Sequence, residues 1–264
     1  MNWEREYHVL TQAIREAGAE AARLATDGFQ TYTKPDDSPV TSADHAVNEI
    51  LHNRLLNAFP DDGWLSEETP DTAARLEKTR VWVIDPIDGT KAFIRREPEY
   101  CVSVALVEHG NPIVAAIYNP STDELYSAVR GSGLRLNDQP VAQDSCDAPH
   151  PLTVALSPWE LHIGRFKSVE AYLAGRPMRS IAWALALAAK GEIHGVMTFE
   201  PENEWDVAAG VLLLEEAGGM AHDGTGHALR YNRPHPRFEG FVATAKVFPE
   251  QLRTHILRLP RSVH

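Results

Sequence analysis

The segment at residues 85–90, Asp-Pro-Ile-Asp-Gly-Thr, constrains the fold of this chain more than any other feature. It follows the apolar run at 81–84, which predicts a buried strand that stops where the acidic residues begin. Pro86 has a fixed φ angle and favours extended geometry at Asp85, so the carboxylates of Asp85 and Asp88 can face one point. Neighbouring carboxylates repel each other unless a cation lies between them. The segment therefore predicts a cation site, whereas a bare Asp-Gly pair would indicate only a turn.

The residue types in this segment suit a hard divalent ion beside a phosphate. Mg2+ takes oxygen ligands, keeps several waters, and is usually held by a few carboxylates together with substrate phosphate. Gly89 lets the backbone approach a ligand closely, and the Thr90 hydroxyl can orient a water or cap a turn. If a helix starts at 89–91, its free amide groups and its positive dipole end point at the same place.

Charge and cysteine content exclude several classes of protein. The formal net charge of -12 argues against nucleic acid as a main partner, because that binding depends on basic patches. Cys101 and Cys146 are too few for a disulfide framework or a structural zinc site, which favours a reducing compartment. Residues 1–24 carry charges throughout, and no apolar run approaches membrane-spanning length. We therefore expect a cytoplasmic protein without a membrane partner.

The first half of the chain reads as two helices and a set of strands. Apolar residues recur at three- and four-residue steps over 3–24 and 43–59, which predicts amphipathic helices, and 29–40 reads as extended or hairpin structure. Strands are expected at 64–66, 81–84, 100–107, 112–118 and 124–128. The last three form an antiparallel meander in this interpretation, because turn residues separate them, and 131–137 extends it.

The second half alternates between the two patterns, which predicts layered α/β structure. We expect strands at 152–156, 179–181, 194–199 and 241–245, and helices at 160–173, 183–190, 204–216 and 249–257. The polar stretch at 139–151 is the candidate boundary. It divides the chain into a metal-binding α+β domain, 1–145, and an α/β domain that completes the active site, 146–264.

Further acidic residues stand at the ends of predicted elements. Glu67 and Glu68 follow the short strand at 64–66, where an isolated pair also reads as solvated loop charges. Asp206 falls in the first turn of an apolar helix, where the helix dipole alone would favour a carboxylate. Its apolar neighbours suggest partial burial, and a buried carboxylate is stabilised by a cation. No zinc-hydrolase, dinucleotide, phosphate-loop or serine-nucleophile motif is present in the sequence.

Two separated motifs resemble the inositol monophosphatase superfamily. They are the segment at 85–93 and the pair at 205–210, Trp-Asp-Val-Ala-Ala-Gly, and 215–219, Glu-Glu-Ala-Gly-Gly. Three more segments, 31–34, 38–44 and 65–68, fit the same family. The resemblance implies a sugar-phosphatase fold, an α/β/α/β/α sandwich with mixed and antiparallel sheets. It also implies a magnesium-dependent phosphomonoesterase that is inhibited by lithium, is often a homodimer, and acts on a small phosphorylated substrate without a covalent protein intermediate.

The resemblance also implies roles for particular residues. The ligands of two or three Mg2+ ions would be Glu67, Asp85, the Ile87 carbonyl, Asp88 and Asp206. Asp44 and Thr90 would orient or activate the attacking water, with Glu67 also counted in the catalytic set. The amides of Gly89 and Thr90 would meet the phosphate, and Asp206 would also border the substrate.

The substrate is left open between three phosphomonoesters. The continuation at 91–94, Lys-Ala-Phe-Ile, is similar to the 3'(2'),5'-bisphosphate nucleotidase branch, which removes the 3'-phosphate of 3'-phosphoadenosine 5'-phosphate. Inositol monophosphate and histidinol phosphate are the alternatives. A role of another class would be that of a non-catalytic partner in RNA processing or transcription. The complete set of metal positions argues against this role. Groups that face the substrate are expected near 180–183 and 200–204.

Overall fold

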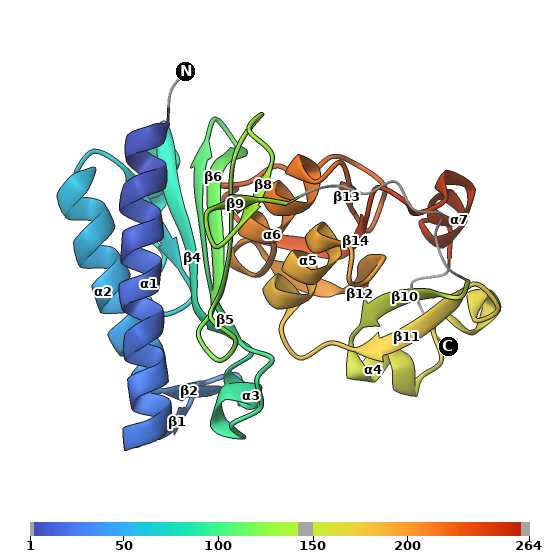
Figure 1. The fold of residues 1–264 in the computed structure, drawn as a ribbon, viewed down its shortest axis with the longest axis horizontal. Coiled ribbons are helices and arrows are strands. Elements are labelled where there is room, and N and C mark those ends of the chain that lie inside the picture. The colour runs from blue at the N-terminus through green and yellow to red at the C-terminus, as the bar shows by residue number, and fades with distance from the viewer. Residues whose placement is uncertain (1–2, 142–149, 260–264) are drawn as a thin grey trace.

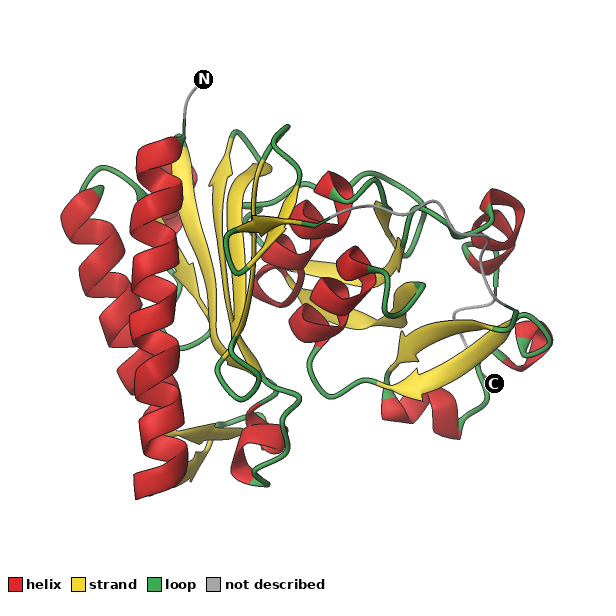
Figure 2. Cartoon of the chain, viewed as in Figure 1, coloured by secondary structure: helices red, strands yellow, loops and turns green. Residues whose placement is uncertain are grey.

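The computed structural model describes residues 3–141 and 150–259. Helices and sheets alternate across the molecule as layers (Figure 1; Figure 2). The outermost layer holds α1 (Glu4–Asp27) and α2 (Ser42–Ala58), which pack on one face of a seven-stranded sheet. The predicted apolar stripe of α1 is confirmed, because Leu10 and Ile14 are fully buried in this interface. Helix α2 begins with a capping box formed by Thr41 and Asp44.

The seven-stranded sheet has the order β3-β4-β5-β6-β7-β8-β9. Its strands are β3 (Gly63–Ser66), β4 (Arg80–Asp88), β5 (Cys101–Glu108), β6 (Asn111–Asn119), β7 (Glu124–Val129), β8 (Leu134–Leu136) and β9 (Gln139–Pro140). Only β3 and β4 run parallel within it, so the sheet is mixed. The predicted antiparallel meander of β5, β6 and β7 is confirmed.

Strand β4 continues beyond the point where the sequence pattern ended it. It pairs with β5 through Asp85 and again at Asp88, with a shift of register between these two residues. Pro86 lies in the shifted part, and a proline has no backbone N–H to donate to a neighbouring strand. The prediction of a strand end at 84 was therefore wrong. The acidic segment is the bulged end of a central strand.

The middle layer consists of α5 (Ile181–Lys190) and α6 (Glu204–Glu216), which lie between the two large sheets (Figure 1). Nearly every side chain of α5 is buried, because it is covered on both sides. The two helices approach closely at Gly210, where an added Cβ would lie 2.4 Å from Cβ of Leu185. This close packing fixes where α6 begins relative to the sheet.

The second large sheet has five strands in the order β11-β10-β12-β14-β13. They are β10 (Leu152–Leu156), β11 (Leu173–Pro177), β12 (Gly195–Asn203), β13 (Met220–Asp223) and β14 (Arg237–Thr244). Strand β10 is parallel to β11 and β12, and the other pairs are antiparallel. The last layer contains α4 (Pro158–His162), the 3-10 turn η2 (Lys167–Val169) and α7 (Glu250–Ile256), which cover the outer face.

Four smaller elements complete the description. A hairpin of β1 (Thr31–Thr33) and β2 (Pro39–Thr41) precedes α2, as the extended reading of this region predicted. The 3-10 turn η1 (Ala73–Glu77) follows β3, and the short helix α3 (Thr90–Ile94) follows β4. Within the described ranges, no helix has the length and apolar character needed to cross a membrane.

Two element predictions in the second half were wrong. The expected helix over 160–173 is broken into α4 and η2, because Gly164 adopts a positive φ of 65° and ends the first turn. The structure has no strand at the expected position, 179–181. The strand in this region is β11, which ends at Pro177, and α5 begins at Ile181. Strand β13 had no counterpart in the predictions.

The layered fold is confirmed. One core lies between α1, α2 and the first sheet, a second surrounds α5 and α6, and a third lies under α4 and α7. Together these cores give the α/β/α/β/α order. The expected domain boundary between residues 145 and 146 lies outside the described residues, so the division into two domains stays a prediction.

Candidate active site

Asp85 is a buried carboxylate with one oxygen left unpartnered. Its side chain sits at the bulge of β4 and is 2% exposed, and its Oδ1 atom accepts no hydrogen bond. Burial raises its pKa well above the ordinary value, and the charges of Glu67, Asp88, Asp206 and Asp44 raise it further. Residues from three distant parts of the chain, together with Asp88 of the same strand, therefore lie within electrostatic range of Asp85. A buried polar atom left unpaired in this way costs stability, and a positive charge beside it would offset that cost.

Asp206 enters this acidic cluster from the first turn of α6. Its Oδ2 accepts a hydrogen bond from the amide of Asn203 at 2.7 Å, which completes a capping box at the start of the helix. The pKa of Asp206 is raised well above its ordinary value by burial, and then by the charges of Glu202, Asp88 and Glu67. Helix capping explains why an aspartate stands at position 206. It does not explain why a second acidic side chain, Glu202, lies beside it.

Glu67 lies directly after β3, where Lys34 from the β1–β2 hairpin approaches it. The Lys34 Nζ atom donates to Glu67 Oε1 at 2.7 Å and to Glu68 Oε1 at 2.6 Å. Glu67 and Glu68 are thus not simple solvated loop charges, because one half-buried ammonium group holds both. The backbone of Glu67 is fixed as well, since its amide donates to the Ile84 carbonyl of β4 at 3.2 Å.

Asp44 and Thr90 form a hydroxyl–carboxylate pair at the edge of the cluster. The Thr90 hydroxyl lies 3.2 Å from Asp44 Oδ1 and 3.0 Å from the Ile87 carbonyl, and can donate to either. The other carboxylate oxygen of Asp44 accepts from the amide and the hydroxyl of Thr41 at 2.8 and 2.6 Å. Burial raises the pKa of Asp44 despite these bonds. The pair is therefore held rigidly by the start of α2.

Asp88 is held from the second half of the chain. Its Oδ2 atom accepts hydrogen bonds from the Ser180 hydroxyl and from the Ala182 amide, both at 2.6 Å. Burial raises the pKa of Asp88 to about 6, although these two donors act in the opposite direction. The start of α5 thus completes the surroundings of an acid that belongs to β4.

Gly89 has a backbone conformation and surroundings that only glycine fits. It is the N-cap of α3 with φ 93° and ψ 34°, and the expected helix start at 89–91 is confirmed. An added Cβ would lie 2.8 Å from the Glu99 carbonyl oxygen and 3.2 Å from the Ser180 Cβ. The glycine therefore permits both the turn after β4 and the approach of the two halves of the chain.

Gly89→Ala is expected to destabilise the protein more than Gly191→Ala. Gly191 has a similar φ of 90° but nothing within 4 Å of an added Cβ, so its substitution carries only the left-handed strain of about 1–2 kcal/mol. At Gly89 the same strain is joined by the clash with the Glu99 carbonyl. Urea unfolding of both variants measures the difference, and equal losses of free energy would contradict the crowding around Gly89.

The donor set of the cluster fits a hard cation. The four charged side chains that raise the pKa of Asp85 all present carboxylate oxygen, and Asp85 Oδ1 is without a partner, which suits Mg2+ rather than zinc. Among the described residues, no three histidine, cysteine or acidic side chains stand close enough together to enclose an ion by themselves. Mg2+ usually keeps several waters and shares a substrate phosphate, so it needs no closed cage.

Three groups near the cluster had no assigned role in the sequence. Lys34 lay in a motif but was given no partner, and Glu202 lay inside a stretch expected to face the substrate. Ser180 also lay inside a stretch expected to face the substrate, but its capping role was missed because the helix was expected to begin at 183, whereas Ser180 is its N-cap. A serine before an apolar helical run is a signal that could have identified it.

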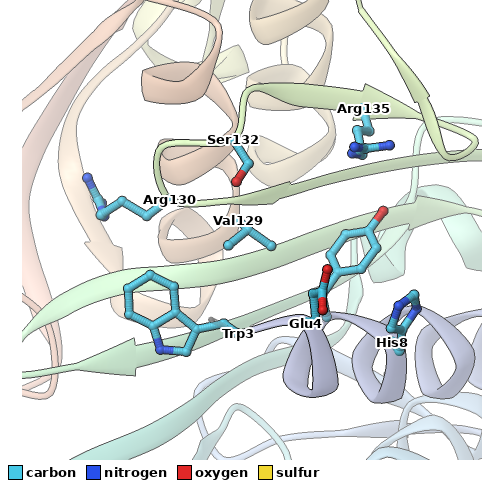
Figure 3. A pocket seen from close by; sticks show the side chains of 8 residues that line it. Trp3, Glu4, His8, Val129, Arg130, Ser132 and Arg135 are labelled. Atoms are coloured by element: carbon cyan, nitrogen blue, oxygen red, sulfur yellow. The ribbon is translucent and has the colours of Figure 1, made fainter. Parts of the chain in front are cut away.

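A separate cavity of about 340 Å³ lies away from the acidic cluster. Figure 3 shows Trp3 and His8 on its α1 side and Ser132 and Arg135 on the side of the β7–β8 turn. None of the predicted site residues lines this cavity.

Comparisons with known proteins find relatives over most of the chain. The profile of the inositol monophosphatase family matches residues 2–259. The chain is 34% identical over 226 residues to the 3'(2'),5'-bisphosphate nucleotidase CysQ of Escherichia coli (strain K12), which covers 83% of this chain and 91% of that protein. It is 33% identical over 231 residues to an inositol-1-monophosphatase of Rhizobium meliloti (strain 1021), with 83% and 85% covered.

A solved structure has the same fold. The crystal structure of the extragenic suppressor protein suhB from Bartonella henselae superposes with a TM-score of 0.81 at 29% sequence identity. The alignment covers 96% of each chain, so both large sheets and the helices between them are included.

Proposed function

The chain belongs to the inositol monophosphatase family and is a phosphatase, and from that premise we propose that it is a Mg2+-dependent phosphomonoesterase acting on 3'-phosphoadenosine 5'-phosphate. The observation that carries the metal dependence is the buried, unpartnered Oδ1 atom of Asp85 among other carboxylates. Without a cation the carboxylates repel one another. A bound cation would remove this repulsion and attract a phosphate group.

The ligands in this proposal are the carboxylates of Glu67, Asp85, Asp88 and Asp206 with the Ile87 carbonyl. Bound Mg2+ would lower the pKa of a coordinated water and offset the charge of the phosphate oxygens. The residues of the chain then orient the reactants. The amides of Gly89 and Thr90, at the start of α3, would donate to the phosphate.

Asp44 and Thr90 are proposed to accept the proton of the attacking water. When the Thr90 hydroxyl donates to Asp44, its oxygen lone pairs remain to accept a hydrogen bond from water. As the water attacks, its proton would pass to Thr90 while the Thr90 proton passes to Asp44. The raised pKa of Asp44 makes its carboxylate a better proton acceptor than an exposed aspartate. No covalent intermediate with the protein is needed.

The choice of substrate rests on the sequence after the acidic segment. The relatives include a bisphosphate nucleotidase and an inositol-1-monophosphatase at nearly equal identity, so similarity alone favours neither. The continuation Lys-Ala-Phe-Ile at 91–94 favours the nucleotide. Inositol monophosphate is the second candidate, because an inositol-1-monophosphatase covers the chain equally well. Lithium inhibition and homodimer formation stay predictions.

A substrate panel tests this proposal. Phosphate release from 3'-phosphoadenosine 5'-phosphate, myo-inositol 1-phosphate and histidinol phosphate would be measured with Mg2+, with excess EDTA, and with Mg2+ plus Li+. We expect the highest kcat/KM for the nucleotide and loss of activity in EDTA. A preference for the inositol phosphate would overturn the nucleotide assignment, and activity that survives EDTA would overturn the metal dependence.

A further inference from the structure

Ser180 joins the acidic cluster to the start of α5 through one hydroxyl group. Its Oγ atom donates to Asp88 Oδ2 at 2.6 Å and accepts from the amide of Trp183 at 3.0 Å. The bond to Asp88 holds a member of the acidic cluster, and the bond from the Trp183 amide caps the N-terminus of α5. The side chain is 4% exposed, so neither contact competes freely with water. One hydroxyl therefore couples a carboxylate of β4 to a helix of the other half of the chain.

The amide of Ala182 adds a second donor to the same oxygen. It lies 2.6 Å from Asp88 Oδ2, so both donors from α5 act on one atom of the carboxylate. The free amides and positive dipole end of α5 also favour negative charge at this place. Asp88 Oδ1 receives neither of these bonds. The two carboxylate oxygens thus have different tasks, because only Oδ2 is used to anchor the side chain to α5.

The segment that carries Ser180 is itself fastened to the loop after α3. The Arg179 Nε atom lies 2.9 Å from Glu97 Oε2 and 3.6 Å from Glu99 Oε2, and Arg176 pairs with Glu99. The Ser180 Cβ also borders the position that a Cβ of Gly89 would occupy, at 3.2 Å. These contacts hold the start of α5 against the end of β4, so Ser180 has little freedom to leave Asp88.

We propose that Ser180 is a positioning residue that orients Asp88 for metal binding. By occupying Oδ2 together with the Ala182 amide, Ser180 leaves Oδ1 as the oxygen for the cation and fixes the rotation of the carboxylate. Partners of a metal ligand that act in this way typically change metal affinity about 10–100-fold when they are removed. This inference rests on the proposed Mg2+-dependent function.

The test compares Ser180→Ala, Ser180→Gly and Ser157→Ala with the unaltered protein. Ser157 is the matched control, because it caps α4 by accepting from the Glu160 amide at 3.1 Å and donates to the Glu160 carboxylate at 3.1 Å. Glycine is a tolerable N-cap but has no hydroxyl, so Ser180→Gly separates the contact with Asp88 from capping. Mg2+ binding would be measured by titration calorimetry without substrate, and the Mg2+ concentration for half-maximal activity by phosphate release.

Both Ser180 variants are expected to weaken Mg2+ binding by about tenfold or more. Ser157→Ala should lower the melting temperature while leaving the Mg2+ affinity unchanged. Unaltered Mg2+ affinity in Ser180→Gly would overturn the positioning role, and so would an equal loss of affinity in Ser157→Ala. If the unaltered protein itself showed no Mg2+-dependent phosphate release, the proposed function would fail first, which is a distinct result.

Discussion

Asp85→Asn is expected to lower kcat/KM by about 10³-fold while raising the melting temperature of the metal-free protein. The loss of activity follows from the proposed metal site, since a catalytic metal ion contributes several kcal/mol and each 1.36 kcal/mol is about tenfold in rate. The gain in stability follows from burial. The folded-state pKa of Asp85 is raised, so its ionised form destabilises the fold at any pH above the unfolded-state pKa. Asparagine cannot ionise, and this cost disappears.

The same substitution at Asp62 provides a control with the opposite sign. Asp62 is also buried, but its carboxylate accepts from the Arg80 guanidinium at 2.8 and 3.0 Å and from Trp82 Nε1 at 3.0 Å. Asp62→Asn removes one of the two countercharges of Arg80 and leaves only Glu6, so it should lower the melting temperature and spare activity. Thermal unfolding with EDTA and with millimolar Mg2+ measures both variants. Stabilisation of Asp85→Asn by Mg2+ equal to that of the unaltered protein would contradict the proposed role of Asp85.

Local sequence patterns predicted the amphipathic helices and the strands that are separated by clear turns. The apolar steps of α1 and α2 and the turn residues between β5, β6 and β7 determine their structure locally, and these predictions were confirmed. Strand β4 was cut short because Asp85 and Asp88 break its apolar run, although both continue the pairing with β5. The prediction of one helix over 160–173 was wrong because the backbone conformation of a single residue, Gly164, decides where the chain turns.

The members of the acidic cluster were predictable, but the contacts that hold them were not. Asp85, Asp88 and Asp206 stand at the ends of strongly patterned elements, so sequence alone indicated them as candidate ligands. The bonds from Lys34 to Glu67 and from Ser180 to Asp88 join residues far apart in the chain. Local periodicity carries no information about such contacts, because they depend on how the layers stack. The metal-binding roles of these acids stay predictions.

Asp44→Asn and Thr90→Ala are each expected to lower kcat by about 10²–10⁴-fold, with KM changed little. If both residues serve one proton transfer, removing either interrupts it, and the double variant should lose hardly more than the worse single variant. The 3.2 Å contact between the Thr90 hydroxyl and Asp44 Oδ1 is the physical basis of this expectation. Steady-state kinetics of the two single variants and the double variant give the coupling.

Thr90→Ser is the matched control, because it keeps the hydroxyl and removes only a methyl group. It should retain most of the activity, since serine can donate to Asp44 or to the Ile87 carbonyl as threonine can. Thr41→Ala tests the support of Asp44 from the other side, because it removes a hydroxyl 2.6 Å from Asp44 Oδ2 and leaves the carboxylate in place. Its loss of kcat should be smaller than that of Asp44→Asn. Strictly additive losses for Asp44→Asn and Thr90→Ala would mean that the two residues act separately, and the proton path through Thr90 would be wrong.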